Sequence, residues 1–181
     1  MKRLLYCIGF AAACALSQGA AAATDMFGKF SGIDGESIQK GHEKWIEILS
    51  YSWGATNGGP FPPGNVEFAD FSLTKLYDSS SPPLLLSLAQ GKHLDEALFE
   101  FTKTTGSATP EVYLTYEFSD VLLTSYGVGG SSGGGSPSES WSFSFAKVQT
   151  TYRAQDNKTG KLGAVKTYNW DIPAGTASPS A

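Results

Sequence analysis

Few side chains in this 181-residue sequence are of the types that catalyse reactions or bind metals. Neither histidine, His42 or His93, has a second His, Cys or carboxylate at the spacing of a metal site. His93 follows an expected helix end, where a local charge partner is the favoured role. His42 precedes an expected strand, and a turn contact is favoured over a pH-sensitive strand edge. The sequence therefore predicts no metal ligand.

Two carboxylates offer the one acid pair of interest. Glu96 and Glu100 fall on the same face of an expected strand. Paired carboxylates that flank a sugar bond are the machinery of glycosidases, which keeps a small hydrolase as an alternative. Same-face acids on a strand more commonly form a solvated surface, and that interpretation is preferred. No nucleophile elbow or Walker loop is present, and the glycine-rich stretch 127–138 opens a strand rather than a helix. We therefore expect a protein without enzymatic activity or cofactor.

The first 23 residues have the composition of a secretory signal peptide. Lys2 and Arg3 form a positive start, Leu4–Leu16 is an uncharged apolar run, and Ala21-x-Ala23 is a small-residue cleavage site. The apolar run is shorter than the ~20 residues of a membrane-spanning helix. The alternatives are an uncleaved anchor or a translation start at Met26.

Removal of residues 1–23 leaves 158 residues, enough for one domain with a real core. Loss of Lys2 and Arg3 moves the formal net charge from −4 to −6. An acidic chain without a basic cluster argues against a nucleic-acid partner. Both cysteines, Cys7 and Cys14, lie in the leader, where Cys14 leaves a weak lipoprotein alternative. No disulfide and no membrane span is therefore expected after residue 23.

The remaining sequence alternates with period two, which is typical of β-strands. The expected strands are Met26–Ile33, Lys44–Trp53, Val66–Lys75, Leu94–Lys103, Val112–Leu123, Glu139–Tyr152 and Val165–Asp171. Residues 127–138 are expected to form a long hairpin loop, and a flexible tail is expected from about residue 173. About seven strands and one helix in a single domain over 24–181 predict a mainly β fold, a small barrel or sandwich.

One short α-helix is expected at Pro82–Gln90. Ser81 is the predicted N-cap, Pro82 suits the first helical position, and Gly91 ends the helix. The helix is short, so packing must stabilise it. The leucines expected to form its packing stripe are Leu84, Leu85, Leu86 and Leu88.

The run Lys44–Gly54 is unusually apolar for one strand. Read at period two, one face is almost wholly large and apolar, and Ile46 and Ile48 make the first half of the other face apolar as well. A half-buried strand is polar on one side. This run is therefore expected to pack on both faces, against a second layer or against another subunit, which favours self-association.

Several ordered motifs in this chain resemble those of the Hcp family, the tube protein of the type VI secretion system. The segments that carry the resemblance are Gly32–Ser37, His42–Ile46, Leu49–Gly54, Lys75–Leu94 and Ser119–Tyr126. The resemblance as a whole extends over about residues 26–170. The resemblance implies a small β-barrel of two antiparallel sheets with one short α-helix, and no catalytic residues.

The resemblance also implies a homohexameric ring, rings stacked into a tube, a sheath, a spike protein and effector proteins in the lumen. The loop Gly54–Asn65 matches the family's extended loop, which reaches a neighbouring subunit. The residues expected to contact other subunits are Trp45, Tyr51, Trp53, Phe61 and Val66.

Family members normally lack a signal peptide, because the tube is assembled in the cytoplasm, so the leader departs from the family pattern. From the leader, a secreted or periplasmic location is expected. The alternative function is an exported binding module of the same fold that acts outside the cytoplasm without a sheath.

Overall fold

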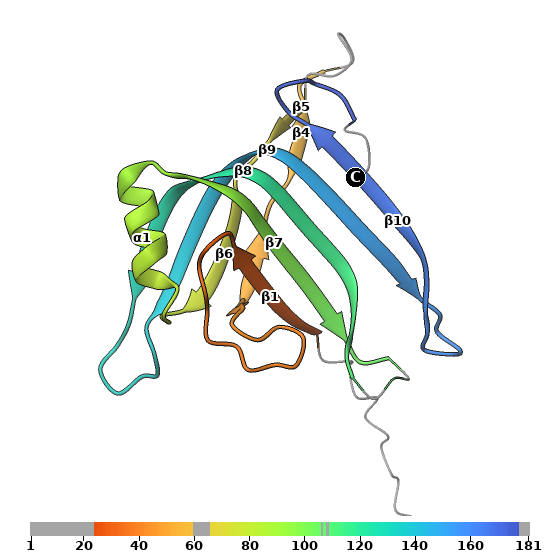
Figure 1. Ribbon diagram of the computed structural model, residues 1–181, viewed down its shortest axis with the longest axis horizontal. Coiled ribbons are helices and arrows are strands. Elements are labelled where there is room, and N and C mark those ends of the chain that lie inside the picture. The colour runs from red at the N-terminus through yellow and green to blue at the C-terminus, as the bar shows by residue number, and fades with distance from the viewer. Residues whose placement is uncertain (1–23, 60–65, 106, 108, 178–181) are drawn as a thin grey trace, which may run out of the picture.

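The computed structural model describes residues 24–59, 66–105, 107 and 109–177. The predicted signal peptide and Phe61 lie outside these residues. The described chain is mainly β with one short helix, as predicted (Figure 1). The strands are β1 (Thr24–Phe30), β2 (Ile46–Glu47), β3 (Ser50–Ser52), β4 (Ala55–Asn57), β5 (Val66–Phe68), β6 (Phe71–Leu76), β7 (His93–Lys103), β8 (Glu111–Gly129), β9 (Ser138–Gln155) and β10 (Leu162–Asp171).

The main sheet is antiparallel and curls into a barrel in the order β2-β1-β7-β8-β9-β6-β3. Its two end strands, β2 and β3, are consecutive in the chain and are separated by Ile48 and Leu49. The Ile48 amide donates to the Met26 carbonyl of β1, and the Leu49 amide donates to the Thr74 carbonyl of β6. One short segment therefore hydrogen-bonds to both edges and closes the sheet on itself.

This closure corrects the expectation of a single strand at Lys44–Trp53. Ile46 and Ile48 are buried, then the pattern changes and Tyr51 and Trp53 turn toward the core. A single strand cannot put both sets on one side, because its side chains alternate. The break between β2 and β3 makes the change of face possible. Most of the apolar side chains of this run thus pack within the core of the same chain.

Aromatic rings fill the barrel. Phe71 is fully buried and lies 4.7 Å from Phe99, 5.0 Å from Phe118 and 5.2 Å from Phe143 between ring centroids. Each of these rings comes from a different strand. The alternation in β6, β7 and β9 predicted these inward positions, and burial of such large rings is the main favourable contribution to a core of this size.

β7, β8 and β9 each change the face they bury at the same level of the barrel. Inward residues there are three positions apart instead of two, and Asp120 of β8 has a left-handed φ of 54°. Val121 is therefore buried, although simple alternation from Phe118 predicts the opposite face. The buried pairs are Leu94 and Ala97, Phe118 and Val121, and Phe145 and Val148.

The helix α1 (Ser81–Gln90) lies on one side of the barrel and packs against β8 (Figure 1). Its cap is Ser80, with no side-chain hydrogen bond, so the prediction that Ser81 caps the helix is wrong. Gly91 ends the helix in a left-handed conformation, as predicted. Leu84 is buried and Leu88 packs on the core, whereas Leu85 and Leu86 are exposed.

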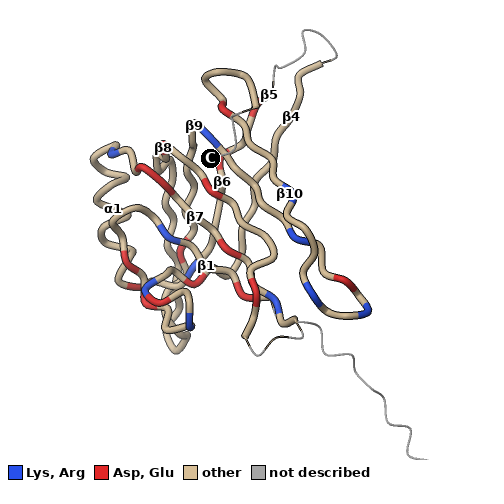
Figure 2. The backbone as a smooth tube through the Cα atoms, turned by 45° about the vertical axis from the view of Figure 1, so that its right-hand side comes forward, with Lys and Arg blue, Asp and Glu red and all other residues tan. Residues whose placement is uncertain are grey.

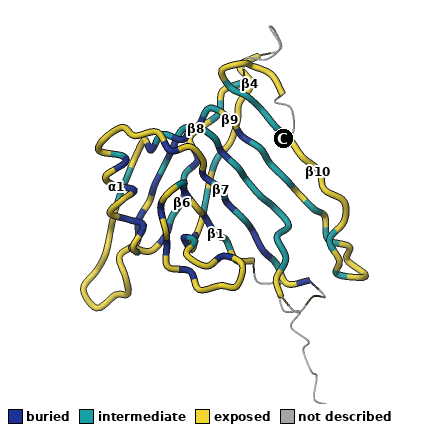
Figure 3. Tube along the Cα trace, viewed as in Figure 1, coloured by how far each residue is buried: buried dark blue, intermediate teal, exposed yellow. Residues whose placement is uncertain are grey.

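Two hairpins project from the barrel. β4 and β5 pair with each other, so the loop expected at 54–65 begins with a strand, and Val66–Lys75 is interrupted between β5 and β6. β10 pairs with the distal half of β9; its residues 163–168 are exposed, whereas Asn169–Asp171 are partly buried (Figure 3). Residues 173–176 fold back in a turn on Asp171. Among the described residues, no helix has the length and hydropathy required to span a membrane.

Candidate functional site

The His42 side chain is buried among aromatic rings rather than in an open cleft. Its ring stacks on Phe27 at 4.3 Å and meets the edge of Trp45 at 4.9 Å. Its Nε2 lies 2.7 Å from the Glu100 carboxylate. The pair connects the loop before β2 to the outer face of β7, so its role is structural. The sequence predicted that His42 makes a turn contact, and its backbone amide does donate to the Gln39 carbonyl. The sequence did not predict Glu100 as the side-chain partner, because it is 58 residues away.

The carboxylates Glu96 and Glu100 do not form a glycosidase pair. They are four residues apart on β7, which at about 3.3 Å per residue separates them by about 13 Å. Glycosidases place their two carboxylates roughly 5–9.5 Å apart. Glu100 is occupied by His42, and Glu96 is exposed. Partial burial and the Glu96 carboxylate raise the pKa of Glu117 on β8, as expected for a cluster of like charges on one sheet face.

His93 and the described acids also lack the geometry of a metal site. The His93 Nδ1 lies 2.6 Å from the Asp120 carboxylate, and both side chains are exposed. His93 therefore has a charge partner, as expected, but the partner lies 27 residues away on β8 and is not local to the helix end. Within the described residues, no three His, Cys, Asp or Glu side chains gather closely enough to hold an ion.

Two of the residues expected to contact other subunits lie partly inside the barrel. The Tyr51 ring is 4.8 Å from Phe101, and burial together with a hydrogen bond to Tyr116 raises the pKa of Tyr51 to about 12. Trp53 packs edge-on against Tyr116 and Phe118. Both side chains remain half-buried, so part of each is available to a neighbour.

The other candidates for subunit contact lie nearer the surface. Trp45 is half-buried beside the Lys29 ammonium, and Val66 begins β5 of the projecting hairpin. Phe61 lies outside the described part of the chain. Contact with another subunit stays a prediction for all five residues.

A buried ion pair that was not predicted from the sequence joins the start of α1 to the barrel. The Lys75 ammonium lies 2.9 Å from the Glu139 carboxylate and 2.7 Å from Asp78. The side chains of Lys75 and Glu139 are 1% and 0% exposed. Ser81 donates to Glu139 at 2.6 Å and accepts from Lys75, while Tyr126 donates to the other Glu139 oxygen at 2.9 Å.

A local signal for this pair was present. Lys75 continues the inward series that contains Phe71 and Leu73, and Glu139 begins the inward series that contains Trp141 and Phe143. Two charged residues at inward positions of neighbouring strands point to a pair, because an isolated buried charge is very costly. Which strands are neighbours was the missing information.

We expect Glu139 to make the free energy of unfolding depend on pH in the acidic range. Burial alone would raise the pKa of this carboxyl, but hydrogen bonds from Lys75, Ser81 and Tyr126 hold it below its ordinary value of 4.5. A carboxyl with a lowered pKa stabilises the fold above its ordinary value and loses that contribution as pH falls. Urea unfolding followed from pH 7 to pH 3 should show wild-type stability falling below about pH 4.5. Glu139→Gln, although less stable at pH 7, should give a shallower decline; parallel curves would contradict the assignment.

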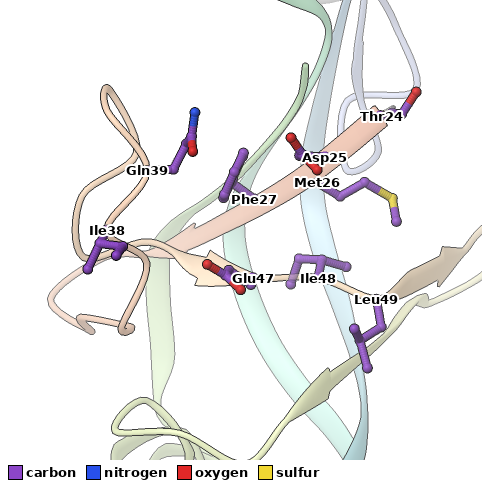
Figure 4. Close-up of a pocket in the computed structure, with 9 residues that line it drawn as sticks. All are labelled: Thr24, Asp25, Met26, Phe27, Ile38, Gln39, Glu47, Ile48 and Leu49. Atoms are coloured by element: carbon purple, nitrogen blue, oxygen red, sulfur yellow. The ribbon is translucent and has the colours of Figure 1, made fainter. Parts of the chain in front are cut away.

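A surface groove lies beside the closing segment of the barrel (Figure 4). It has a volume of about 400 Å³ and is lined by Thr24–Phe27 of β1, by Ile38 and Gln39 of the following loop, and by Glu47–Leu49. Ile38 is 92% exposed and Leu49 is 52% exposed. Both of these large apolar side chains line the groove and are open to solvent. Among the described residues that line the groove, no nucleophile–base pair or metal-ligand set is present.

Comparisons with known proteins agree with the mainly β fold of this chain. The family model described as "Type VI secretion system effector, Hcp" matches residues 27–152. Protein hcp1 of Pseudomonas aeruginosa is 35% identical over 156 residues, which cover 83% of this chain and 96% of the relative.

Solved structures are similar over most of the chain. The crystal structure of Hcp1 from Salmonella typhimurium matches with a TM-score of 0.73 at 30% identity, and covers 86% of this chain and 99% of that one. A structure described as a type six secretion system protein matches with a TM-score of 0.77 at 28% identity. It covers 86% of this chain and all of that one.

Proposed function

Because this chain belongs to the Hcp family of type VI secretion proteins, we propose that it is a structural, ring-forming component of a secretion apparatus. The proposed unit is a homohexameric ring, and stacked rings form a tube whose lumen accommodates effector proteins. The partners are further copies of the chain, a spike protein and a sheath. No reaction is assigned to the protein.

The observation that carries the proposal is the extent of the family match. Residues 27–152 run from within β1 to near the end of β9 and reach all seven strands of the closed barrel. The match therefore concerns the whole architecture and not one motif. Exposed apolar side chains on separate parts of the molecule, including Ile38, Leu49 and Val165, support self-association through more than one surface.

The predicted leader adds a location to the proposal. Export by a signal peptide would place assembly in the periplasm or outside the cell, whereas delivery by the apparatus would start from the cytoplasm. Mass spectrometry of the protein recovered from each compartment distinguishes the routes, since signal-peptide cleavage gives a chain that begins at Thr24, whereas the alternative start gives one that begins at Met26.

Ring formation is tested by the mass of the protein in solution. All described strands and the helix lie within residues 24–177, so a chain that begins at Thr24 contains the whole barrel. Size-exclusion chromatography with light scattering on residues 24–181 is expected to give six times the chain mass. Electron microscopy of the same fraction should show rings. A monomer at high protein concentration would contradict the ring proposal.

A further inference from the structure

Charge is divided unevenly between two parts of this chain. Residues 147–171, here called the basic hairpin, comprise the distal half of β9, the turn and β10. They carry five Lys or Arg and two Asp or Glu, a formal net charge of +3. Residues 24–146 carry a formal net charge of −9. Figure 2 shows the basic residues spread along β10 and its turn, and acidic residues over the β1 and β7 side of the molecule.

The basic hairpin also presents apolar surface that the barrel does not cover. Lys166 is directly opposite Tyr152 across the strand pair, and Tyr168 follows two residues later on the same face. Tyr152 is 41% exposed and Tyr168 is 47% exposed. β10 pairs with β9 alone among the described strands, so its other edge is free. Free edges and exposed aromatic rings are features that proteins cover when they assemble.

The basic residues of the hairpin have charge to offer a partner. Among the residues that the structure describes, none of Lys158, Lys161 and Lys166 takes part in an ion pair. All three are exposed. Lys147, in contrast, is occupied by Asp171 at 2.9 Å.

The groove beside the closing segment has the complementary character. Its walls carry the carboxylates of Asp25 and Glu47, and the exposed apolar side chains of Ile38 and Leu49 flank it (Figure 4). An aromatic ring with a neighbouring lysine fits such a surface, because the ring covers apolar side chains while the ammonium meets a carboxylate.

We propose that the basic hairpin of one copy docks in the groove lined by Asp25, Ile38, Glu47 and Leu49 of the next copy. The two surfaces are different parts of the chain, so the contact is head-to-tail. Such a contact repeats around a ring when its rotation closes. This inference rests on the proposed ring function and names the surfaces that would build it.

Charge reversal on the two sides provides the test. In residues 24–181, Lys158→Glu/Lys161→Glu and Asp25→Lys/Glu47→Lys are each expected to weaken association by about tenfold or more, because each places like charges together. The four substitutions combined restore opposite charges and the net charge of the wild type, and should return association to within about threefold of the wild type. Lys92→Glu, at an exposed lysine after α1, is the control and should leave association unchanged. Sedimentation velocity over a concentration series measures all four.

The outcomes separate the contact from the ring proposal. A monomeric wild type would contradict ring formation itself. A wild type that assembles, with both reversed variants assembling equally well, would contradict only the hairpin contact. Two weakened variants without recovery in the combined protein would likewise overturn the direct pairing. Circular dichroism of each variant establishes that the barrel has folded before association is compared.

Discussion

Lys75→Met is expected to lower the free energy of unfolding by about 3–5 kcal/mol, because it leaves the Glu139 carboxylate buried without its cation. Lys75 and Glu139 are almost completely shielded from water. The loss should therefore exceed that of an exposed lysine by a wide margin. Urea unfolding at pH 7, followed by circular dichroism at two protein concentrations, measures the change in the chain itself apart from its assembly.

A second substitution shows whether the cost comes from the stranded charge. Lys75→Met/Glu139→Gln removes both charges and keeps an amide that Tyr126 and Ser81 can still contact. It should be more stable than Lys75→Met alone, since replacing both members of a buried ion pair is commonly far less costly than breaking it. The matched control is Lys92→Met, which should change stability by about 0.5 kcal/mol or less. A loss below about 1 kcal/mol for Lys75→Met would contradict the role given to the pair.

Trp53→Ala is the second large effect we expect, with a loss of about 3 kcal/mol in unfolding free energy. The indole lies within 5.5–6.5 Å, centroid to centroid, of five aromatic rings of its own chain. Its removal leaves a cavity at the closing edge of the barrel that the neighbouring rings cannot fill. Because Trp53 is half-buried, the value lies at the low end of the range for a large aromatic residue.

The same variant distinguishes the two roles of Trp53. A core residue lowers unfolding stability at every protein concentration, whereas a residue that acts only between subunits lowers association and makes the stability loss depend on concentration. Leu86→Ala, at a leucine 57% exposed on α1, is the control and should change unfolding stability little. Unchanged unfolding together with lost association would assign Trp53 to the subunit contact instead of the core.

Much of the fold could be predicted because its signals are local. Alternating residues in β7 and β9 identified Phe99, Phe101, Trp141 and Phe143 as inward, and all four are buried. Pro82 and Gly91 marked the ends of α1. Such signals operate within a few residues, where strand and helix geometry fixes which side chains share a face.

The errors occurred where tertiary structure overrides a local pattern. Lys44–Trp53 has the alternation of a single, largely apolar strand, yet hydrogen bonds to β1 on one side and β6 on the other divide it into β2 and β3. Val121 is buried because β8 changes face at Asp120 together with its neighbours. Ser81 is polar and precedes a proline, which predicts an N-cap, but its hydroxyl accepts a hydrogen bond from Lys75 and donates one to Glu139 instead.

The sequence by itself determined the class of fold, the inward faces of most strands, the family resemblance and the absence of cysteine after residue 23. Only the tertiary structure decided which strands are neighbours, and therefore that Lys75 meets Glu139 and that His42 meets Glu100. It also decided that the apolar run Lys44–Gly54 closes the barrel and leaves a groove beside it with Leu49 exposed. The reason is physical: side-chain alternation depends on adjacent residues, whereas strand pairing joins positions 60 or so residues apart through register and closure, which no local pattern encodes.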